Sequence, residues 1–493
     1  MSHLSTDRYN GTATKYCFAE FPSIKIYKNQ TDKDWNNHLL FGDYIKILDT
    51  EVVNNRIRVR CRGNTGWVKV DEIRKDRLLE INFVDIGQGD GCHVVTPDDQ
   101  HFIVDAGKGD NMERYLSWRF NLYDRKTPLP FLFKGIISHS DLDHYGGFKN
   151  IFKNDKINFD KIYHNCLVER PGDLPFGEVK NNHILGLVRT NDEMRALIGD
   201  QNNRKGTRST YCKTLYECLK YSPDVEFIGL LEENRFVQDF DGSNTIKGLP
   251  FSLKVLGPIH EGSNGRHALR TINNTGKDKN GHSLIIKLQY DKARMLLGGD
   301  VNSEFGEIIC NYYKSINRPD ELEVDAAKAC HHGSNHFNYD FLEAVNSAAT
   351  IISSGDDESY AHPRPDAIGA FGKCGYGKKP LIFSTELARS NVELTMAKLK
   401  KLNMLVAKAE SLATEIKKID NDALTRNLKT QLLKTNKNLN SYLTKYGMIN
   451  LRTDGSKMII AQKLEKQASY GKWDIHKLEY SQSSGRFELS EAH

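Results

Sequence analysis

Four side chains that bind metal ions stand within six residues of one another, in the segment SHSDLDHYGG at 138–147. They are His139, Asp141, Asp143 and His144. Burying two carboxylates and two imidazoles together is unfavourable unless a cation neutralises the carboxylates. Oxygen and imidazole ligands suit zinc, manganese or iron. The alternative is a polar turn that caps a helix, but a cap needs one such residue, not four. We therefore expect a divalent metal site here.

The elements that must position this turn are short apolar strands. An apolar run at 131–137 predicts a buried strand that ends at Ser138. Similar runs are expected as strands at 80–85, 102–105, 284–290, 294–297 and 324–330, and they bring His, Asp and Gly residues to their ends. Helices are expected between them, near 112–125, 192–198, 211–219 and 303–313. This alternation predicts an α/β layered fold with the polar residues gathered at one edge of the sheets.

The chain divides into four parts by composition. Residues 1–78 hold short alternating strands and predict a small β-barrel, whereas residues 79–385 carry the alternating strands and helices. Residues 386–446 lack Gly and Pro and predict a helical hairpin with a leucine stripe. Residues 447–463 predict a β-hairpin that rejoins the sheet, and the tail from Trp473 is expected to be partly mobile. The polar stretch 261–281 is expected to be a long loop beside the site.

Composition sets broad limits on the surroundings of the protein. The chain has 493 residues and a formal net charge of +5, which tolerates a polyanionic partner without requiring one. No apolar run approaches the roughly 20 residues of a membrane span, and the first residues show no secretion signal. The nine cysteines are scattered without a CxxC pair. We therefore expect a cytoplasmic protein with no membrane segment.

A family resemblance rests on several motifs in order. The segments are VDIGQGDG at 84–91, IVDAG at 103–107, SHSDLDHYGG at 138–147, LLGGD at 296–300, HHGS at 331–334 and SYAHP at 359–363. Together they resemble the metallo-β-lactamase fold superfamily, and more narrowly the hydrolase domain of the ComEC family of DNA-uptake proteins and its stand-alone relatives. Separately, GNTGWVKVDEI at 63–73 resembles bacterial SH3-like domains. The first resemblance implies an αββα sandwich with two divalent metal ions between the strand ends.

The resemblance also implies a ligand set. One ion would be held by His139, Asp141 and His282, the other by Asp143, His144 and His331, and Asp300 would bridge them. Asp141 replaces the second histidine that is usual in the superfamily, so both Zn²⁺ and Mn²⁺ stay open. Of the two adjacent histidines, His331 is favoured as the ligand and His332 as its neighbour behind it. Three further side chains are expected to brace the ligands: Asp85, Asp105 and Ser334. For Asp105, a turn residue that accepts backbone N–H groups is the alternative.

The implied chemistry is hydrolysis by a hydroxide shared between two ions. Asp143 would orient that nucleophile, and His362, with His332, is the candidate for contacting a phosphate oxygen or protonating the leaving group. Lys108 and Arg364 are candidates for cationic contacts, whereas His336 is expected to be a bystander.

Three functions follow, and the first is favoured. It is a phosphodiesterase or nuclease acting on DNA, RNA or a nucleotide. The second is hydrolysis of another ester, such as phosphorylcholine, a lactone or a thioester, because the superfamily hosts all of these. The third is a partner-binding component of a defence or toxin module, in which the SH3-like domain and the helical hairpin dock other proteins. The leucine stripe between 399 and 443 is expected to pack either within the chain or in a homodimer. The lysine-rich face of the same helices is expected either to be solvated or to contact nucleic-acid phosphates.

Overall fold

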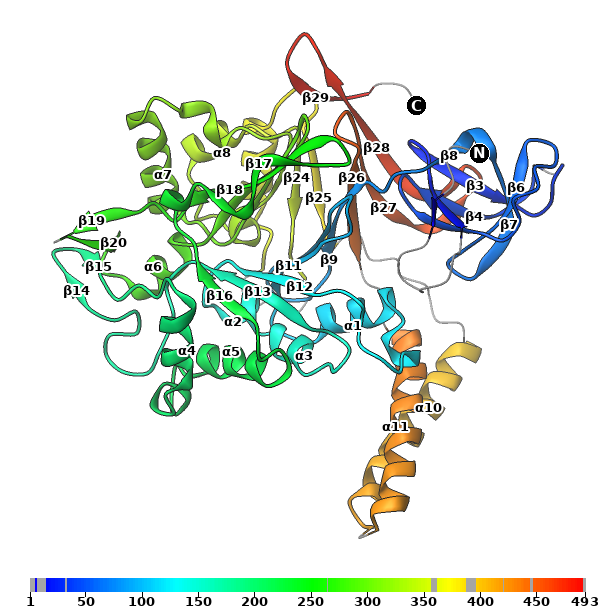
Figure 1. Cartoon of the computed structure of the whole chain (residues 1–493), viewed down its shortest axis with the longest axis horizontal. Coiled ribbons are helices and arrows are strands. Elements are labelled where there is room, and N and C mark those ends of the chain that lie inside the picture. The colour runs from blue at the N-terminus through cyan, green and yellow to red at the C-terminus, as the bar shows by residue number, and fades with distance from the viewer. Residues whose placement is uncertain are drawn as a thin grey trace.

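The protein is a mixed α/β structure built around two large β-sheets (Figure 1). The computed structural model describes residues 5–6, 15–31, 33–263, 265–355, 361–386, 396–419, 421–443 and 447–490. The alternation of apolar strands with helices predicts such a mixed structure, and this coarse prediction is confirmed.

The larger sheet joins the middle of the chain to its C-terminal part. Its strands lie in the order β16-β13-β12-β11-β10-β9-β26-β27-β28-β29. From β11 to β16 neighbouring strands are parallel, whereas β26 pairs antiparallel with β9. The bounds are β9 Leu79–Val84, β10 Gly91–Val95, β11 His101–Ala106, β12 Phe133–Ile137, β13 Phe159–His164, β16 Glu226–Gly229, β26 Met448–Thr453, β27 Lys457–Ala468, β28 Gly471–Ser481 and β29 Arg486–Leu489.

The second sheet comes from the stretch between 236 and 384. Its order is β17-β18-β21-β22-β23-β24-β25, with parallel pairing from β22 onward. The bounds are β17 Phe236–Ile246, β18 Leu249–Gly257, β21 Ile285–Tyr290, β22 Ala293–Gly298, β23 Ala326–Lys328, β24 Ala349–Ile352 and β25 Leu381–Ser384.

One apolar core lies between the two sheets, and helices cover their other faces. Because successive side chains of a strand point to opposite faces, Phe102 of β11 joins the shared core while Ile103 packs against helices. Ile286 of β21 likewise joins the shared core, and Ile285 faces outward. The covering helices are α1 Asn111–Arg119, α3 Phe148–Phe152, α4 Asn191–Gly199 and α5 Thr210–Tyr221 on the larger sheet, and α7 Ser303–Ser315, α8 Tyr339–Val345 and α9 Pro365–Cys374 on the smaller one.

The N-terminal part forms a small antiparallel sheet with a core of its own. It lies beside the C-terminal strands β27 and β28 (Figure 1). The Trp473 indole N–H donates to the carbonyl oxygen of His38 at 3.0 Å, which ties β28 to β4. The strands are β1 Ser5–Thr6, β2 Lys15–Ala19, β3 Ser23–Tyr27, β4 Trp35–Leu40, β5 Tyr44–Ile47, β6 Arg56–Cys61, β7 Asn64–Lys69 and β8 Ile73–Arg74.

Two long helices, α10 Met396–Ile416 and α11 Asp422–Leu443, pack against each other and extend away from the sheets (Figure 1). Leu402, Leu412 and Leu428 are buried, whereas Met404 and Leu433 are exposed. Parts of the predicted hairpin, 387–395, 420 and 444–446, lie outside the described residues. No helix in the described ranges is both long and apolar enough to cross a bilayer.

The sequence prediction of a long loop at 261–281 is wrong. The stretch 261–281 forms β19 Glu261–Ser263, β20 Arg266–Arg270 and helix α6 Thr275–Gly281. The Asn274 side chain accepts from the N–H of Lys277 and caps α6, while the Asp278 carboxylate accepts from the N–H of Ile272. This stretch also pairs with β15 His183–Ile184, which in turn pairs with β14 Val179–Lys180; such a partner distant in sequence leaves no local signal.

The tail from Trp473, which is predicted to be partly mobile, forms strands as far as Leu489. It supplies most of β28 and all of β29, because β28 pairs along β27 and two apolar side chains of the tail, Leu478 and Phe487, enter the core between the sheets.

Candidate metal centre

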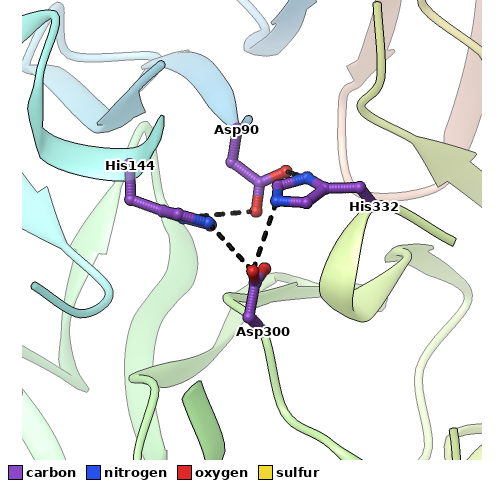
Figure 2. A group of neighbouring side chains, drawn as sticks. All are labelled: Asp90, His144, Asp300 and His332. Atoms are coloured by element: carbon purple, nitrogen blue, oxygen red, sulfur yellow. Dashed lines mark ion pairs between the residues drawn. The ribbon is translucent and has the colours of Figure 1, made fainter. Parts of the chain in front are cut away.

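Four buried side chains meet where four strands end: Asp90, His144, Asp300 and His332 (Figure 2). Asp90 follows β9, and His144 lies in the short helix α2 Leu142–Tyr145 after β12. Asp300 follows β22, and His332 follows β23. Each offers one ligand atom, and these atoms all lie within 4.8 Å of one another. The group is therefore compact enough to hold a metal ion.

Both imidazoles turn the same nitrogen toward Asp300. His144 Nε2 lies 3.2 Å from Asp300 Oδ2, and His332 Nε2 lies 3.3 Å from the same oxygen (Figure 2). Neither Nε2 atom, nor Asp300 Oδ1, has a hydrogen-bond partner among the described residues. Buried polar atoms without a partner are costly, and a cation placed among these three would satisfy them. The donor set of two imidazoles and a carboxylate thus fits a divalent metal ion.

The other nitrogen of each ring is held from behind by a carboxylate. His144 Nδ1 is hydrogen-bonded to Asp105 Oδ2 at 2.8 Å. His332 Nδ1 lies 3.0 Å from Asp90 Oδ1 and is hydrogen-bonded to the carbonyl oxygen of Ser353 at 3.2 Å. Carboxylates that bind a histidine in this way set its tautomer and leave Nε2 for a metal ion. Asp90 is in turn hydrogen-bonded to the buried ammonium of Lys328, which donates to the carbonyl oxygen of Gly298 at 2.9 Å.

The carboxylates of this group shift the pKa values of both imidazoles. Burial by itself would lower the pKa of His144, but Asp300 and Asp105 raise that pKa well above its usual range. Burial likewise opposes the charge of His332, and Asp300 and Asp90 outweigh it, so the pKa of His332 also rises well above the usual value. The carboxylates therefore favour the protonated form of both imidazoles. A divalent ion binding here would replace those protons.

Asp105 also holds the turn that carries the predicted ligands. Its Oδ1 accepts from the main-chain N–H of Ser138 at 2.8 Å, and its Oδ2 accepts from the Ser138 hydroxyl at 2.6 Å. Asp105 has a positive φ of 51°, an uncommon conformation for a residue with a side chain. The three contacts of its carboxylate keep it there.

The glycine-rich loop after β9 packs directly on the 138–147 turn. Gly89 has φ +101°, and a Cβ at this position would lie 1.7 Å from the carbonyl oxygen of Asp143. The main-chain N–H of Asp90 donates to that same carbonyl oxygen at 3.2 Å. Only glycine permits this approach, which places Asp90 behind His332.

The sequence favours His331 over His332, and the structure places them the other way. Both residues have φ 52°, in the turn at Cys330–Gly333. This turn brings the His332 imidazole into the buried group. The His331 side chain remains 20% exposed, with its Nε2 3.9 Å from Asp300 Oδ2. The direction of a side chain in such a left-handed turn cannot be read from the residue order.

His282 is not part of the buried group. Its Nε2 donates to the carbonyl oxygen of Arg270 at 2.7 Å, and its ring packs edge-on against Phe305.

His139 lies close to the group, with its ring centroid 4.1 Å from that of His144. His139 Nε2 is 3.5 Å from Asp141 Oδ2, and its Nδ1 contacts the hydroxyl groups of two serines, Ser138 and Ser283.

Three other predicted residues lie around the group. Asp143 Oδ2 is 3.9 Å from His332 Nε2 and accepts from the Gln88 amide at 3.4 Å. The His362 ring lies 6.2 Å from that of His332, centroid to centroid. Lys108 reaches the same Gln88 side chain, donating to its Oε1 at 3.2 Å.

The hydrogen bonds that the structure shows for the remaining predicted residues involve main-chain groups. Asp85 Oδ1 accepts from the N–H of Gly87, Ser334 Oγ accepts from the N–H of His336, and the N–H of Arg364 donates to the carbonyl oxygen of Gly333. The first two residues of the SYAHP motif, 359 and 360, lie outside the described residues.

Sequence reasoning missed Asp90 and Lys328. The signal for Asp90 was present, because it is the second aspartate of VDIGQGDG and, like Asp300, follows a strand in a glycine-rich loop. Lys328 had no such signal, since it reads as part of the apolar strand β23.

A second group, Glu233, His260 and His267, lies outside this centre and is partly exposed. Glu233 already pairs with Arg189, whose Nη2 lies 2.6 Å from Glu233 Oε1. No protein-family model matches the chain, and no curated protein matches it.

Proposed function

We propose that this chain is a metal-dependent hydrolase of phosphodiester bonds, with a nucleic acid or a nucleotide as substrate. The observation that carries the proposal is the convergence of two unpartnered imidazole Nε2 atoms on the Asp300 carboxylate. The order of the motifs, which resembles the ComEC-type branch of the metallo-β-lactamase superfamily, supports this reading.

The residues proposed to hold the ion are His144, His332 and Asp300, with Asp143 at the open side. When bound, a divalent ion at such a site polarises a phosphoryl oxygen and lowers the pKa of a water molecule toward neutrality. Zn²⁺ and Mn²⁺ both accept this mixture of nitrogen and oxygen ligands.

The chain's own groups would do the rest of the work. Asp143 is 19% exposed and is oriented by Gln88, so it is proposed to align the attacking water. His362 faces the two adjacent histidines and is proposed to donate a proton to the leaving oxygen. Lys108 is exposed and donates to the Gln88 side chain that also contacts Asp143, so it is proposed to offer positive charge to an anionic phosphodiester.

The test is turnover by the purified full-length chain with Mn²⁺ or Zn²⁺. The substrates are single-stranded DNA, double-stranded DNA, RNA and bis(p-nitrophenyl) phosphate, with a lactone as the competing class. We expect phosphodiester cleavage that Asp300→Asn abolishes, because that change removes the carboxylate between the two imidazoles. The exposed carboxylate variant Asp155→Asn is the matched control and should retain activity. Cleavage of the lactone alone, or equal turnover by Asp300→Asn, would contradict the proposal.

A further inference from the structure

We infer that the centre holds one metal ion, and that the Lys279 ammonium takes the place of a second ion at the His139–Asp141 side. The inference rests on the proposed metal site. It departs from the two-metal expectation that the family resemblance implies, and its basis is what the structure places around Asp141.

Lys279 lies between two carboxylates. Its Nζ is 2.5 Å from Asp141 Oδ1 and 3.6 Å from Glu169 Oε1. The Lys279 side chain is only 14% exposed, so its charge is held in place rather than screened by solvent. One cation therefore already neutralises the carboxylate that a metal ion on this side would need.

The second oxygen of Asp141 is also engaged. In the amide orientation that satisfies both of its polar atoms, the Asn280 nitrogen donates to Asp141 Oδ2 at 2.8 Å and to the carbonyl oxygen of Gly276 at 3.3 Å. Lys279 and Asn280 are adjacent residues of α6. One short helix thus occupies both oxygens of Asp141.

The same helix withdraws the third ligand. His282 follows α6 directly, and its main-chain N–H donates to the carbonyl oxygen of Asp278 at 3.1 Å. Its Nε2 is used by the carbonyl oxygen of Arg270. The ring nitrogen that would complete a site with His139 and Asp141 is therefore committed elsewhere.

The two sides of the centre differ in what they leave unsatisfied. On one side, His144 Nε2, His332 Nε2 and Asp300 Oδ1 lack hydrogen-bond partners within the described ranges. On the other side, His139 Nε2 is the one such atom of the three predicted ligands, and a single imidazole nitrogen does not make a metal site. Lys328 does not change this difference between the two sides. Its ammonium is hydrogen-bonded to Asp90, and not to one of the unpartnered atoms of His144, His332 or Asp300.

The test is Mn²⁺ binding to the full-length chain after its metal has been removed. Titration gives the number of ions bound per chain, and electron paramagnetic resonance shows whether two bound ions are spin-coupled. We expect the wild type to bind one Mn²⁺ per chain and to give the spectrum of an isolated ion. Lys279→Ala should bind a second, weaker Mn²⁺ and should show spin coupling between two ions, because it frees Asp141 Oδ1 close to the unpartnered His139 Nε2. Lys277→Ala is the matched control, since Lys277 lies on the same helix and pairs with the distant Glu304. It should behave as the wild type does.

Two coupled ions in the wild type would overturn the inference. So would a single ion in Lys279→Ala, because Lys279 would then not be what excludes the second one. Neither readout depends on turnover: one bound ion without phosphodiester cleavage would refute the proposed function alone. Failure to bind either Mn²⁺ or Zn²⁺ would overturn both.

Discussion

Asp105 holds His144 by its Nδ1, and the Ser353 carbonyl oxygen together with Asp90 holds His332 by its Nδ1, which decides the nitrogen that faces the centre. The residue types alone would allow either ring nitrogen of His144 and His332 to bind a metal ion. The two carboxylates remove that freedom before any ion arrives. Metal affinity should therefore depend on residues that need not touch the ion.

Asp105→Asn tests this dependence. The amide must place an N–H₂ group against one of three donors, the Ser138 N–H, the Ser138 hydroxyl or His144 Nδ1. We expect affinity for Zn²⁺ or Mn²⁺ to fall by about 10–100-fold, the usual effect of losing such a carboxylate. Competition with a chromogenic chelator measures it. Asp155→Asn should leave the affinity unchanged, and an unchanged affinity in Asp105→Asn would show that Asp105 is only a turn residue.

Elements position the centre through the close fit of loops that come from different strands. The loop between β9 and β10 reaches the 138–147 turn at Gly89, and the turn after β23 reaches Asp300 through His332. These contacts lie at the same edge because β11 and β12 are parallel in one sheet and β22 and β23 are parallel in the other. A substitution that separates two of these loops should therefore cause loss of the bound metal ion without unfolding either sheet.

Gly89→Ala is predicted to separate them. The new Cβ would fall on the Asp143 carbonyl oxygen, so the loop must move and carry Asp90 away from His332. Gly63→Ala is a matched control, since Gly63 also has a positive φ, of +81°, but has no neighbouring atom within 4 Å of the added Cβ. We expect both variants to fold, as judged by circular dichroism, and only Gly89→Ala to lose bound metal by elemental analysis. Full metal content in Gly89→Ala would refute this account of the loop.

At the scale of the whole molecule, a buried charge network joins the N-terminal sheet to the rest. Arg452 of β26 donates to the carbonyl oxygen of Phe41 and pairs with Asp43, both at 2.8 Å, and its Nη2 lies 3.4 Å from Glu80. The N-terminal sheet is therefore fastened to the C-terminal strands. Its role as a partner-binding module, and the homodimer through the leucine stripe of α10 and α11, stay predictions.

Arg452→Met should weaken this attachment. Removing one member of a buried charge pair leaves the other uncompensated, which typically costs about 3–5 kcal/mol of unfolding free energy. Urea denaturation at pH 7 measures the loss. Arg58→Met, which changes an exposed arginine on β6, should have little effect.

The loss of unfolding free energy in Arg452→Met should depend on pH in one direction. Burial would raise the pKa of Asp43, but Arg62 and Arg452 lower it overall. Burial would also raise the pKa of Glu80, but Arg119 and Arg452 hold that pKa well below its usual value. Carboxyls with a lowered pKa stabilise the fold above their unfolded pKa of about 4, and this stabilisation is lost as the pH falls through the folded value. The difference between wild type and Arg452→Met should therefore be full at pH 7 and narrow below about pH 4. A constant difference would show that the arginine acts through packing alone.

The sequence by itself determined the mixed α/β layering and the positions of the chemistry-bearing residues along it. Short apolar runs that lead into His, Asp and Gly need only local information, so strands such as β12 and β22 and the turn at His139–His144 could be predicted. The pairing of β26 with β9 also agrees with the alternation in its hairpin.

The tertiary structure alone decided which of those residues face one another. It put His332 rather than His331 beside Asp300, brought Asp90 and Lys328 behind it, and set Lys279 against Asp141. The physical reason is that these contacts join side chains from elements far apart in the chain. Their directions follow from left-handed turns and from strand pairing, which residue spacing does not encode.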